Sequence, residues 1–176
     1  MKKSLFFVII CLLLTSCNSE AEYDKKQQKA FEKALLTLTA SVGVCDGVSS
    51  AWRTAIFDRR TPSGRKCNDF DEAIVEVMAY YKENGMLDSI SIYKSAMDVA
   101  TSELADPPTS RKDCYNDFLS VVSDISELSR CATNPSGSFR SYNEKINELV
   151  ERILKEIDQF SIKYGKYIRL KDAESE

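Results

Sequence analysis

The sequence predicts an all-α protein: an antiparallel four-helix bundle with up-down-up-down topology, whose second helix is kinked or broken near Gly85. Two observations predict this fold. Apolar residues recur at alternating steps of three and four in every long segment, the spacing of one helix face, and no segment shows the apolar–polar alternation of a strand. In addition, the stretches between these segments carry the prolines and glycines typical of helix ends.

The chain begins with a segment outside this pattern. Lys2 and Lys3 form a short basic region, residues 5–14 form an apolar region of ten residues, and Leu14-Thr15-Ser16-Cys17 follows. This pattern resembles the signal peptide and lipobox of bacterial lipoproteins, in which cleavage precedes the cysteine and the cysteine is acylated. The apolar region is also short for a hydrocarbon layer of about 30 Å. The resemblance implies a signal peptide over residues 1–16, lipidation at Cys17 and a single mature domain over residues 17–176.

The same resemblance implies where the protein is located in the cell. The mature domain is expected to be held by its lipid on the bacterial cell envelope; we prefer the outer membrane, with the domain either periplasmic or exposed at the surface. Glu20, Glu22 and Asp24 resemble the acidic tract that sends some lipoproteins to the cell surface, although acidic residues also suit a helix N-terminus. Loss of Lys2 and Lys3 leaves 22 basic against 27 acidic side chains, so the formal side-chain charge changes from -3 to -5. We therefore expect no binding to nucleic acid.

The first predicted helix covers residues 20–58 and is about 55 Å long at ~1.5 Å per residue. Its apolar face consists of Phe31, Leu35, Leu38, Val42, Cys45, Ser49, Trp52 and Ile56. Residues 40–51 are small, with Asp46 as their only charge. Gly43 and Gly47 should each cost about 1 kcal/mol relative to alanine inside a helix, which predicts close approach of a neighbouring helix. A ligand groove or a partner-binding face is the alternative.

The connector over residues 58–68 contains Pro62 and Gly64 and cannot continue the helix. It also contains four basic residues: Arg59, Arg60, Arg65 and Lys66. In the predicted bundle this connector lies far from the membrane. The four basic residues are therefore candidate contacts for an anionic partner, and a solvated charged loop is the alternative.

The second helix is predicted to start at Asn68, which has the side chain of an N-cap. Its apolar residues fall into two stripes of the same spacing: Phe70, Ile74, Val77 and Tyr81, then Ile90, Tyr93, Met97, Ala100 and Leu104. The phase between the stripes slips at Asn84-Gly85. We prefer one long kinked helix, because it would match the first helix in length. The alternative is a helix that ends at Gly85, followed by a new helix from about Asp88.

Pro107-Pro108 ends this element, and Ser110 and Asp113 are candidate caps of a third helix. A turn at residues 134–137 separates it from a fourth helix. The third stripe is Cys114, Phe118, Val121, Ile125, Leu128 and Ala132, and the fourth is Phe139, Tyr142, Ile146, Leu149, Ile153 and Phe160. The basic and aromatic residues 161–171 would return toward the membrane, where they could touch lipid or form the frayed end of the helix.

Four cysteines remain in the mature chain besides the lipidated one: Cys45, Cys67, Cys114 and Cys131. An even number in an oxidising compartment predicts two disulfides that staple the bundle. With a kinked second helix, the expected pairs are Cys67 with Cys131 and Cys45 with Cys114. A helix that ends at Gly85 would reverse the third helix, bringing Cys67 near Cys114 and Cys45 nearer Cys131. No CxxC pair is present, so a zinc or redox motif is not indicated.

Catalytic chemistry is mostly excluded by composition. The chain contains no histidine, which removes histidine-dependent nucleophilic triads and histidine ligation of haem, zinc or di-iron. It contains no glycine-rich phosphate-binding motif. Its carboxylates recur at the spacing of exposed helix faces: Glu72 with Glu76, and Glu144, Glu148 and Glu151. We therefore predict a protein that is not an enzyme, with no catalytic residue, metal site or cofactor.

The sequence thus predicts a lipid-anchored, non-enzymatic binding or interaction module, whose partner is an envelope component or an incoming protein. The alternative is a carrier of a small apolar ligand, held in a cavity between helices that Trp52, Tyr80, Tyr81 and Phe118 would line. A cavity on the order of several hundred Å³ would favour the carrier. A filled core with an exposed apolar or charged tip would favour the interaction module.

Overall fold

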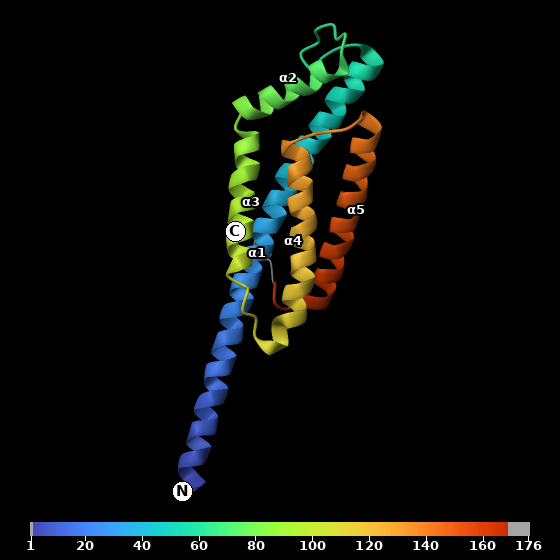
Figure 1. Cartoon of the computed structure of the whole chain (residues 1–176). Helices are drawn as coiled ribbons and strands as arrows, with labels where there is room; N and C mark the ends of the chain where they lie inside the picture. The colour runs from blue at the N-terminus through green and yellow to red at the C-terminus, as the bar shows by residue number, and fades with distance from the viewer. Residues whose placement is uncertain (1, 169–176) are drawn as a thin grey trace, which may run out of the picture.

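The computed structural model describes residues 2–168, with side chains from Ser19 to Ile168 (Figure 1). It confirms the all-α prediction and contains five α-helices and one short 3₁₀-helix in the described part. These elements are α1 (Lys2–Asp58), α2 (Phe70–Glu83), α3 (Met86–Ser102), η1 (Thr109–Arg111), α4 (Lys112–Thr133) and α5 (Phe139–Tyr164). Residues 19–168 are called the helical body below.

Helix α1 is the spine of the helical body. It packs against α2, α3, α4 and α5, and the last three lie along it in alternating directions (Figure 1). Helix α2 instead crosses the end of the body where α1 finishes. We call that end distal and the end at Ser19 basal. The structure therefore has five helices where four were predicted, because the second element is divided.

The preference for one kinked second helix is wrong, since the chain breaks at Gly85. Helix α2 ends at Glu83, Gly85 has φ 70, and α3 begins at Met86 rather than near Asp88. A left-handed residue interrupts a helix, and glycine adopts that conformation without a Cβ penalty. The reversal expected for the third predicted helix, which is α4, does not follow, because α2 lies across the end of the body and α3 descends beside α1 (Figure 1).

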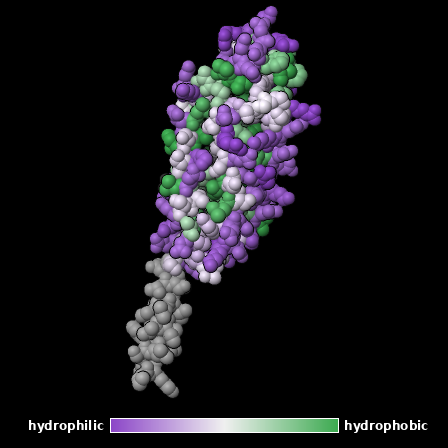
Figure 2. Space-filling model, in the orientation of Figure 1, coloured by the Kyte–Doolittle hydropathy of each residue, from purple (hydrophilic) through white to green (hydrophobic). Residues whose placement is uncertain are grey.

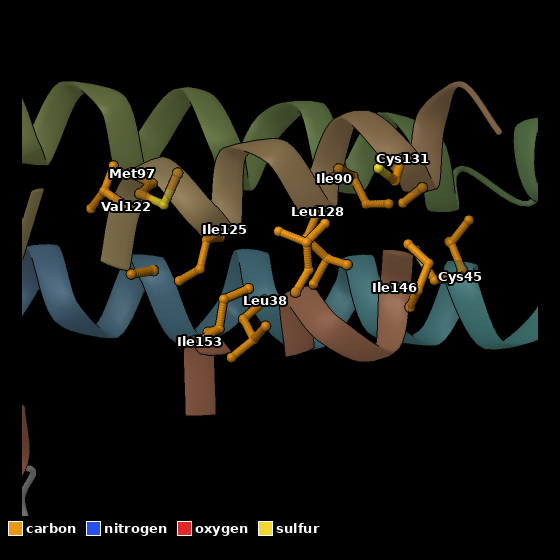
Figure 3. Packing of buried hydrophobic residues seen from close by; sticks show 14 of the residues in the cluster. Leu38, Cys45, Ile90, Met97, Val122, Ile125, Leu128, Cys131, Ile146 and Ile153 are labelled. Carbon is orange, nitrogen blue, oxygen red and sulfur yellow. The ribbon is translucent and has the colours of Figure 1, made fainter. Parts of the chain in front are cut away.

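The predicted stripes of α1, α4 and α5 face one another in a filled core. Figure 3 shows Leu38, Ile125, Leu128 and Ile153 meeting from three helices. Toward the basal end, the ring of Phe31 lies 5.5 Å from that of Phe160 and 6.4 Å from that of Phe118, measured between centroids. Such contacts between large buried side chains supply most of the stabilisation available to a domain of this size.

The part of α1 from Ser19 to Asp58 is long and apolar enough to cross a membrane, by length and composition alone. Core helices of water-soluble domains pass the same test, and 44% of the most apolar window of this helix is buried in the helical body. We therefore describe this part of α1 as the central helix of the core. The predicted signal peptide and the Cys17 side chain lie outside the side chains that the structure describes.

Candidate functional site

The small-residue middle of α1 lies beneath α2. A Cβ added at Gly47 would come 1.6 Å from the Tyr81 hydroxyl oxygen and 2.7 Å from Tyr81 Cζ. A Cβ added at Gly43 would meet nothing within 4 Å. The close approach predicted from these two glycines is therefore confirmed at Gly47, where it admits the Tyr81 ring.

The two glycines provide a matched test of this contact. Gly43→Ala is expected to raise the free energy of unfolding by about 0.5–1 kcal/mol, because alanine restricts the unfolded chain and meets open space in the helix. Gly47→Ala is expected to lower it by about 1–3 kcal/mol, because the buried Tyr81 ring must move. Urea denaturation measures both. Equal effects of the two substitutions would contradict this description of the contact.

A surface groove of about 800 Å³ lies beside this contact. Helix α1 forms one wall and α2 the other, and the loop between them closes one end. The lining residues are Gly47, Ser50, Ala51, Thr54, Pro62, Ser63, Glu76, Val77, Ala79, Tyr80, Tyr81 and Glu83. We call this feature the distal groove. It is the candidate functional site because it combines small residues, exposed aromatic surface and carboxylates.

Two tyrosines, Tyr80 and Tyr81, supply the aromatic surface of the distal groove. Tyr81 is only 9% exposed, and its hydroxyl makes no hydrogen bond within the part of the chain that the structure describes. Its burial, with smaller effects from Tyr80 and Asp46, raises the pKa of this hydroxyl above the ordinary value, so it stays protonated at neutral pH. Tyr80 is 57% exposed, and its ring centroid lies 5.7 Å from that of Tyr81. The groove therefore offers one exposed aromatic ring, from Tyr80, and one hydroxyl without a partner among the described residues, from Tyr81.

The loop beside the groove is ordered by its own hydrogen bonds. The Thr61 N–H donates to the Arg65 carbonyl and the Gly64 N–H to the Thr61 carbonyl, both at 2.8 Å. Glu76 of α2 accepts a hydrogen bond from the Ser63 N–H at 2.7 Å and pairs with Arg65. The Arg65 contact, together with the Ser63 N–H, lowers the pKa of Glu76 to about 2. The loop is thus fastened to α2 through Glu76.

The structure places the four basic residues predicted to contact a partner in this loop. Arg65 pairs with Glu76, the Arg60 guanidinium donates to the Gly64 carbonyl at 2.9 Å, and the Arg59 guanidinium lies 5.2 Å from the centre of the Phe70 ring. Lys66 makes no contact of these kinds with any described residue. Residues 58–76 carry five acidic and four basic side chains, so this tip has no net positive charge. Its role as a partner contact stays a prediction.

The basal end is held by a second polar cluster, which sequence reasoning missed. Arg111 is 8% exposed, and its Nε and Nη2 donate to the Asp24 carboxylate at 2.7 and 3.0 Å. The guanidinium also lies 3.6 Å from Glu20 and 3.8 Å from the centre of the Tyr167 ring. The Ser110 hydroxyl donates to Glu20 at 2.7 Å. We call these five residues the basal clasp; it joins residues 20–24 of α1, the 3₁₀-helix η1 and the C-terminal segment.

The structure does not show the predicted disulfide staple, because Cys45, Cys67, Cys114 and Cys131 are all free and buried. The pair Cys45 with Cys114 is wrong in position: Cys114 starts α4 at the basal end near Asp24, whereas Cys45 lies near Cys131 at the other end of α4. The pair Cys67 with Cys131 is likewise absent. Burial raises the pKa of Cys45 to about 11 and that of Cys114 to about 12, so both thiols are protonated at neutral pH.

The four aromatic residues predicted to line a carrier cavity do not share one. Trp52 and Phe118 are buried in the core, and the Trp52 ring packs edge-on against Tyr142 with centroids 5.2 Å apart. Tyr80 and Tyr81 lie at the distal groove instead. The carrier prediction therefore loses its expected site, although the groove itself has the volume of a small-ligand pocket.

The carboxylates considered for chemistry form no site with one another. Glu144 pairs with Arg140 at 2.7 Å, and Glu148 and Glu151 are exposed along α5. Within residues 19–168, no group of three or more cysteine or carboxylate side chains is arranged to hold a metal ion.

No protein-family model, no curated protein and no solved structure matches this chain. We therefore infer its function from its own residues.

Proposed function

We propose that this protein is a lipoprotein of the bacterial cell envelope, anchored through a lipid on Cys17, and that its helical body binds a partner protein without catalysis. The preferred membrane is the outer membrane. Two features support the proposal. One is the lipobox-like sequence that ends at Cys17. The other, which carries the binding function, is the distal groove at the end of the body opposite to that cysteine.

The basal clasp supports a short connection between lipid and body. Glu20 follows Cys17 by three residues, a span of at most about 11 Å of chain. Because Glu20 is held by Ser110 and Arg111, the body would begin directly above the membrane surface. Helix α1 rises for 40 residues from Ser19 to Asp58, or about 60 Å. The distal groove would then be presented about 40–50 Å from the lipid.

The exposed surface supports a protein partner. Three large apolar side chains lie exposed on α2 and at the end of α1: Val75 at 69%, Tyr80 at 57% and Phe57 at 70%. In Figure 2 the distal tip is mainly hydrophilic, with separate apolar patches below it. Apolar and aromatic anchors inside a polar surround are typical of protein interfaces. Since the core is filled, we favour this function over transport of a ligand within the bundle.

Site-specific photocrosslinking in the protein's own cells tests the proposal. A photoreactive phenylalanine derivative replaces Val75, beside the groove, in the full-length lipidated protein. The matched control carries it at Leu154 of α5, which is 55% exposed. A protein-sized adduct from position 75 and none from position 154 is the expected result. No adduct at position 75, or equal adducts at both positions, would contradict the proposal.

A carrier of a small apolar ligand remains the second candidate, supported by the groove volume of about 800 Å³. Extraction of the purified native protein with organic solvent, followed by mass spectrometry, distinguishes the two functions. A stoichiometric apolar molecule besides the covalent lipid would support the carrier. Its absence, together with a protein adduct at position 75, would support the interaction module.

We further propose that Cys45 and Cys131 form a disulfide in the exported protein. The Tyr142 hydroxyl donates to the Cys131 carbonyl at 3.3 Å and lies close enough to Cys45 to affect the pKa of its thiol, so one phenol lies near both residues. No two of the described cysteines lie at disulfide distance, so α1 and α4 would have to move toward each other for this bond to form. The two thiols would lose two protons and two electrons to a thiol oxidant of the exported compartment.

Alkylation of the denatured protein without reductant tests this bridge. We expect label on Cys67 and Cys114, which lie at opposite ends of the body, and none on Cys45 and Cys131. Reduction before alkylation should add label at the last two positions. Label on all four cysteines without reductant would contradict the bridge, and so would a peptide that joins Cys45 or Cys131 to Cys67 or Cys114.

A further inference from the structure

We propose that the distal groove binds a lysine or arginine side chain of the partner protein, between the Glu83 carboxylate, the exposed Tyr80 ring and the hydroxyl of Tyr81. This inference rests on the function proposed above and names the chemistry of the partner at the same site.

The carboxylates at the groove differ in their pairing. Glu76 is engaged by Arg65 and the Ser63 N–H. Glu83 lines the groove, yet no lysine or arginine in the described part of the chain lies within ion-pair distance of it. Asp46, next to Gly47 on α1, is exposed and likewise has no such partner among those residues. A cation entering the groove would therefore meet negative charge that the protein does not neutralise itself.

The exposed ring supplies the second recognition element. A lysine or arginine placed over an aromatic face is attracted by the ring quadrupole. This protein already uses that contact elsewhere, since Arg111 lies 3.8 Å and Lys166 4.7 Å from the centre of the Tyr167 ring. The Tyr80 ring at the groove is 57% exposed, and no described cation lies over it.

The third element is an unpartnered polar group at the wall of the groove. Tyr81 is 9% exposed and lies over Gly47, but its hydroxyl has no hydrogen-bond partner among residues 19–168. A hydroxyl that makes no hydrogen bond within the protein is available to a ligand. Its oxygen can accept a hydrogen bond from an ammonium or guanidinium group. The hydroxyls of Ser50 and Thr54 line the α1 wall and offer further acceptors.

The basic loop beside the groove does not repel a lysine or arginine side chain bound there. Pro62 and Ser63 are the loop residues that line the groove, and the nearby Arg65 is neutralised by Glu76. The mature chain carries 22 basic and 27 acidic side chains, so the overall field also favours a cation. An anionic partner of the basic loop is the opposite prediction, and the experiment below separates the two.

The purified full-length lipoprotein in detergent micelles is titrated with a short peptide in which lysine alternates with serine. Two matched peptides carry glutamate or norleucine in place of lysine. Chemical-shift changes of the Gly47 amide and the Tyr81 ring report binding at the groove. We expect saturable shifts from the lysine peptide alone. Glu83→Lys should weaken this binding by about tenfold or more, and Glu148→Lys, the same change on exposed α5, should leave it unchanged.

Equal binding of the norleucine peptide would overturn the inference in favour of an apolar site, and preferential binding of the glutamate peptide would overturn it in favour of an anionic partner. No saturable shift with any peptide up to about 10 mM would also overturn it. The photocrosslink from position 75 separates this failure from that of the proposed function. If the adduct forms and Glu83→Lys leaves its yield unchanged, the interaction stands and only the basic chemistry is wrong.

Discussion

Replacing Arg111 with alanine is expected to lower the free energy of unfolding by about 3 kcal/mol. The guanidinium is nearly buried, and it holds the Asp24 carboxylate through two hydrogen bonds at 2.7 and 3.0 Å. Its removal leaves the partly buried Asp24 without a cation and also removes the stacking partner of Tyr167. Since the basal clasp joins three segments, we expect α1 around residues 20–24 and the C-terminal segment to lose amide-exchange protection first.

Arg152 provides the matched control. It makes the same two-point contact with Asp124, but its side chain is 50% exposed, compared with 9% for Arg111. Water screens a half-exposed guanidinium, so Arg152→Ala should lower the free energy of unfolding by clearly less than Arg111→Ala, although the Asp124 side chain is only 15% exposed. Urea denaturation of both variants measures the difference. A cost for Arg111→Ala no greater than that for Arg152→Ala would show that the clasp does not hold the basal end.

Phe118→Ala is expected to lower the free energy of unfolding by about 3–5 kcal/mol. Phe118 is fully buried, and its ring centroid lies 6.4 Å from that of Phe31 and 5.7 Å from that of Phe160. The three rings join α1, α4 and α5, so truncation leaves a cavity that none of these helices can close alone. The neighbouring residue Leu119 is 37% exposed, and Leu119→Ala should cost about 1 kcal/mol or less.

Similar decreases in the free energy of unfolding for Phe118→Ala and Leu119→Ala would contradict the packing described for these three rings. A loss from Phe118→Ala alone, with unchanged helical circular dichroism before unfolding, would support it. Chemical denaturation monitored by circular dichroism provides both readings in one experiment.

The stripes of α4 and α5 could be predicted because apolar spacing alone shows which side of a helix is buried. Phe118, Ile125, Ile146 and Ile153 are all buried as their spacing requires. The same reasoning could not place α2. Periodicity identifies a buried face but neither the helix it meets nor the angle of crossing, so the sequence indicates a break at Gly85 but not the direction in which the chain continues.

The position of a residue along the bundle axis is harder to predict from the sequence than the face it occupies. Pairing Cys45 with Cys114 assumed that both lie partway along facing helices, but Cys114 lies near Asp24, about 30 Å below Cys45 along α1. Arg111 has no periodic signal, since a buried ion pair looks like any charged loop in sequence. Gly47 did signal a close approach, but not its partner Tyr81, which lies in a separate helix.

We propose that a lipid on Cys17 holds the helical body at a membrane with its groove facing away. Intact-mass and N-terminal peptide mass spectrometry of the native protein test this anchor. We expect a chain that lacks residues 1–16 and begins at a Cys17 bearing a thioether-linked diacylglyceryl group. A chain that retains Met1, or that begins at an unmodified Cys17, would contradict it.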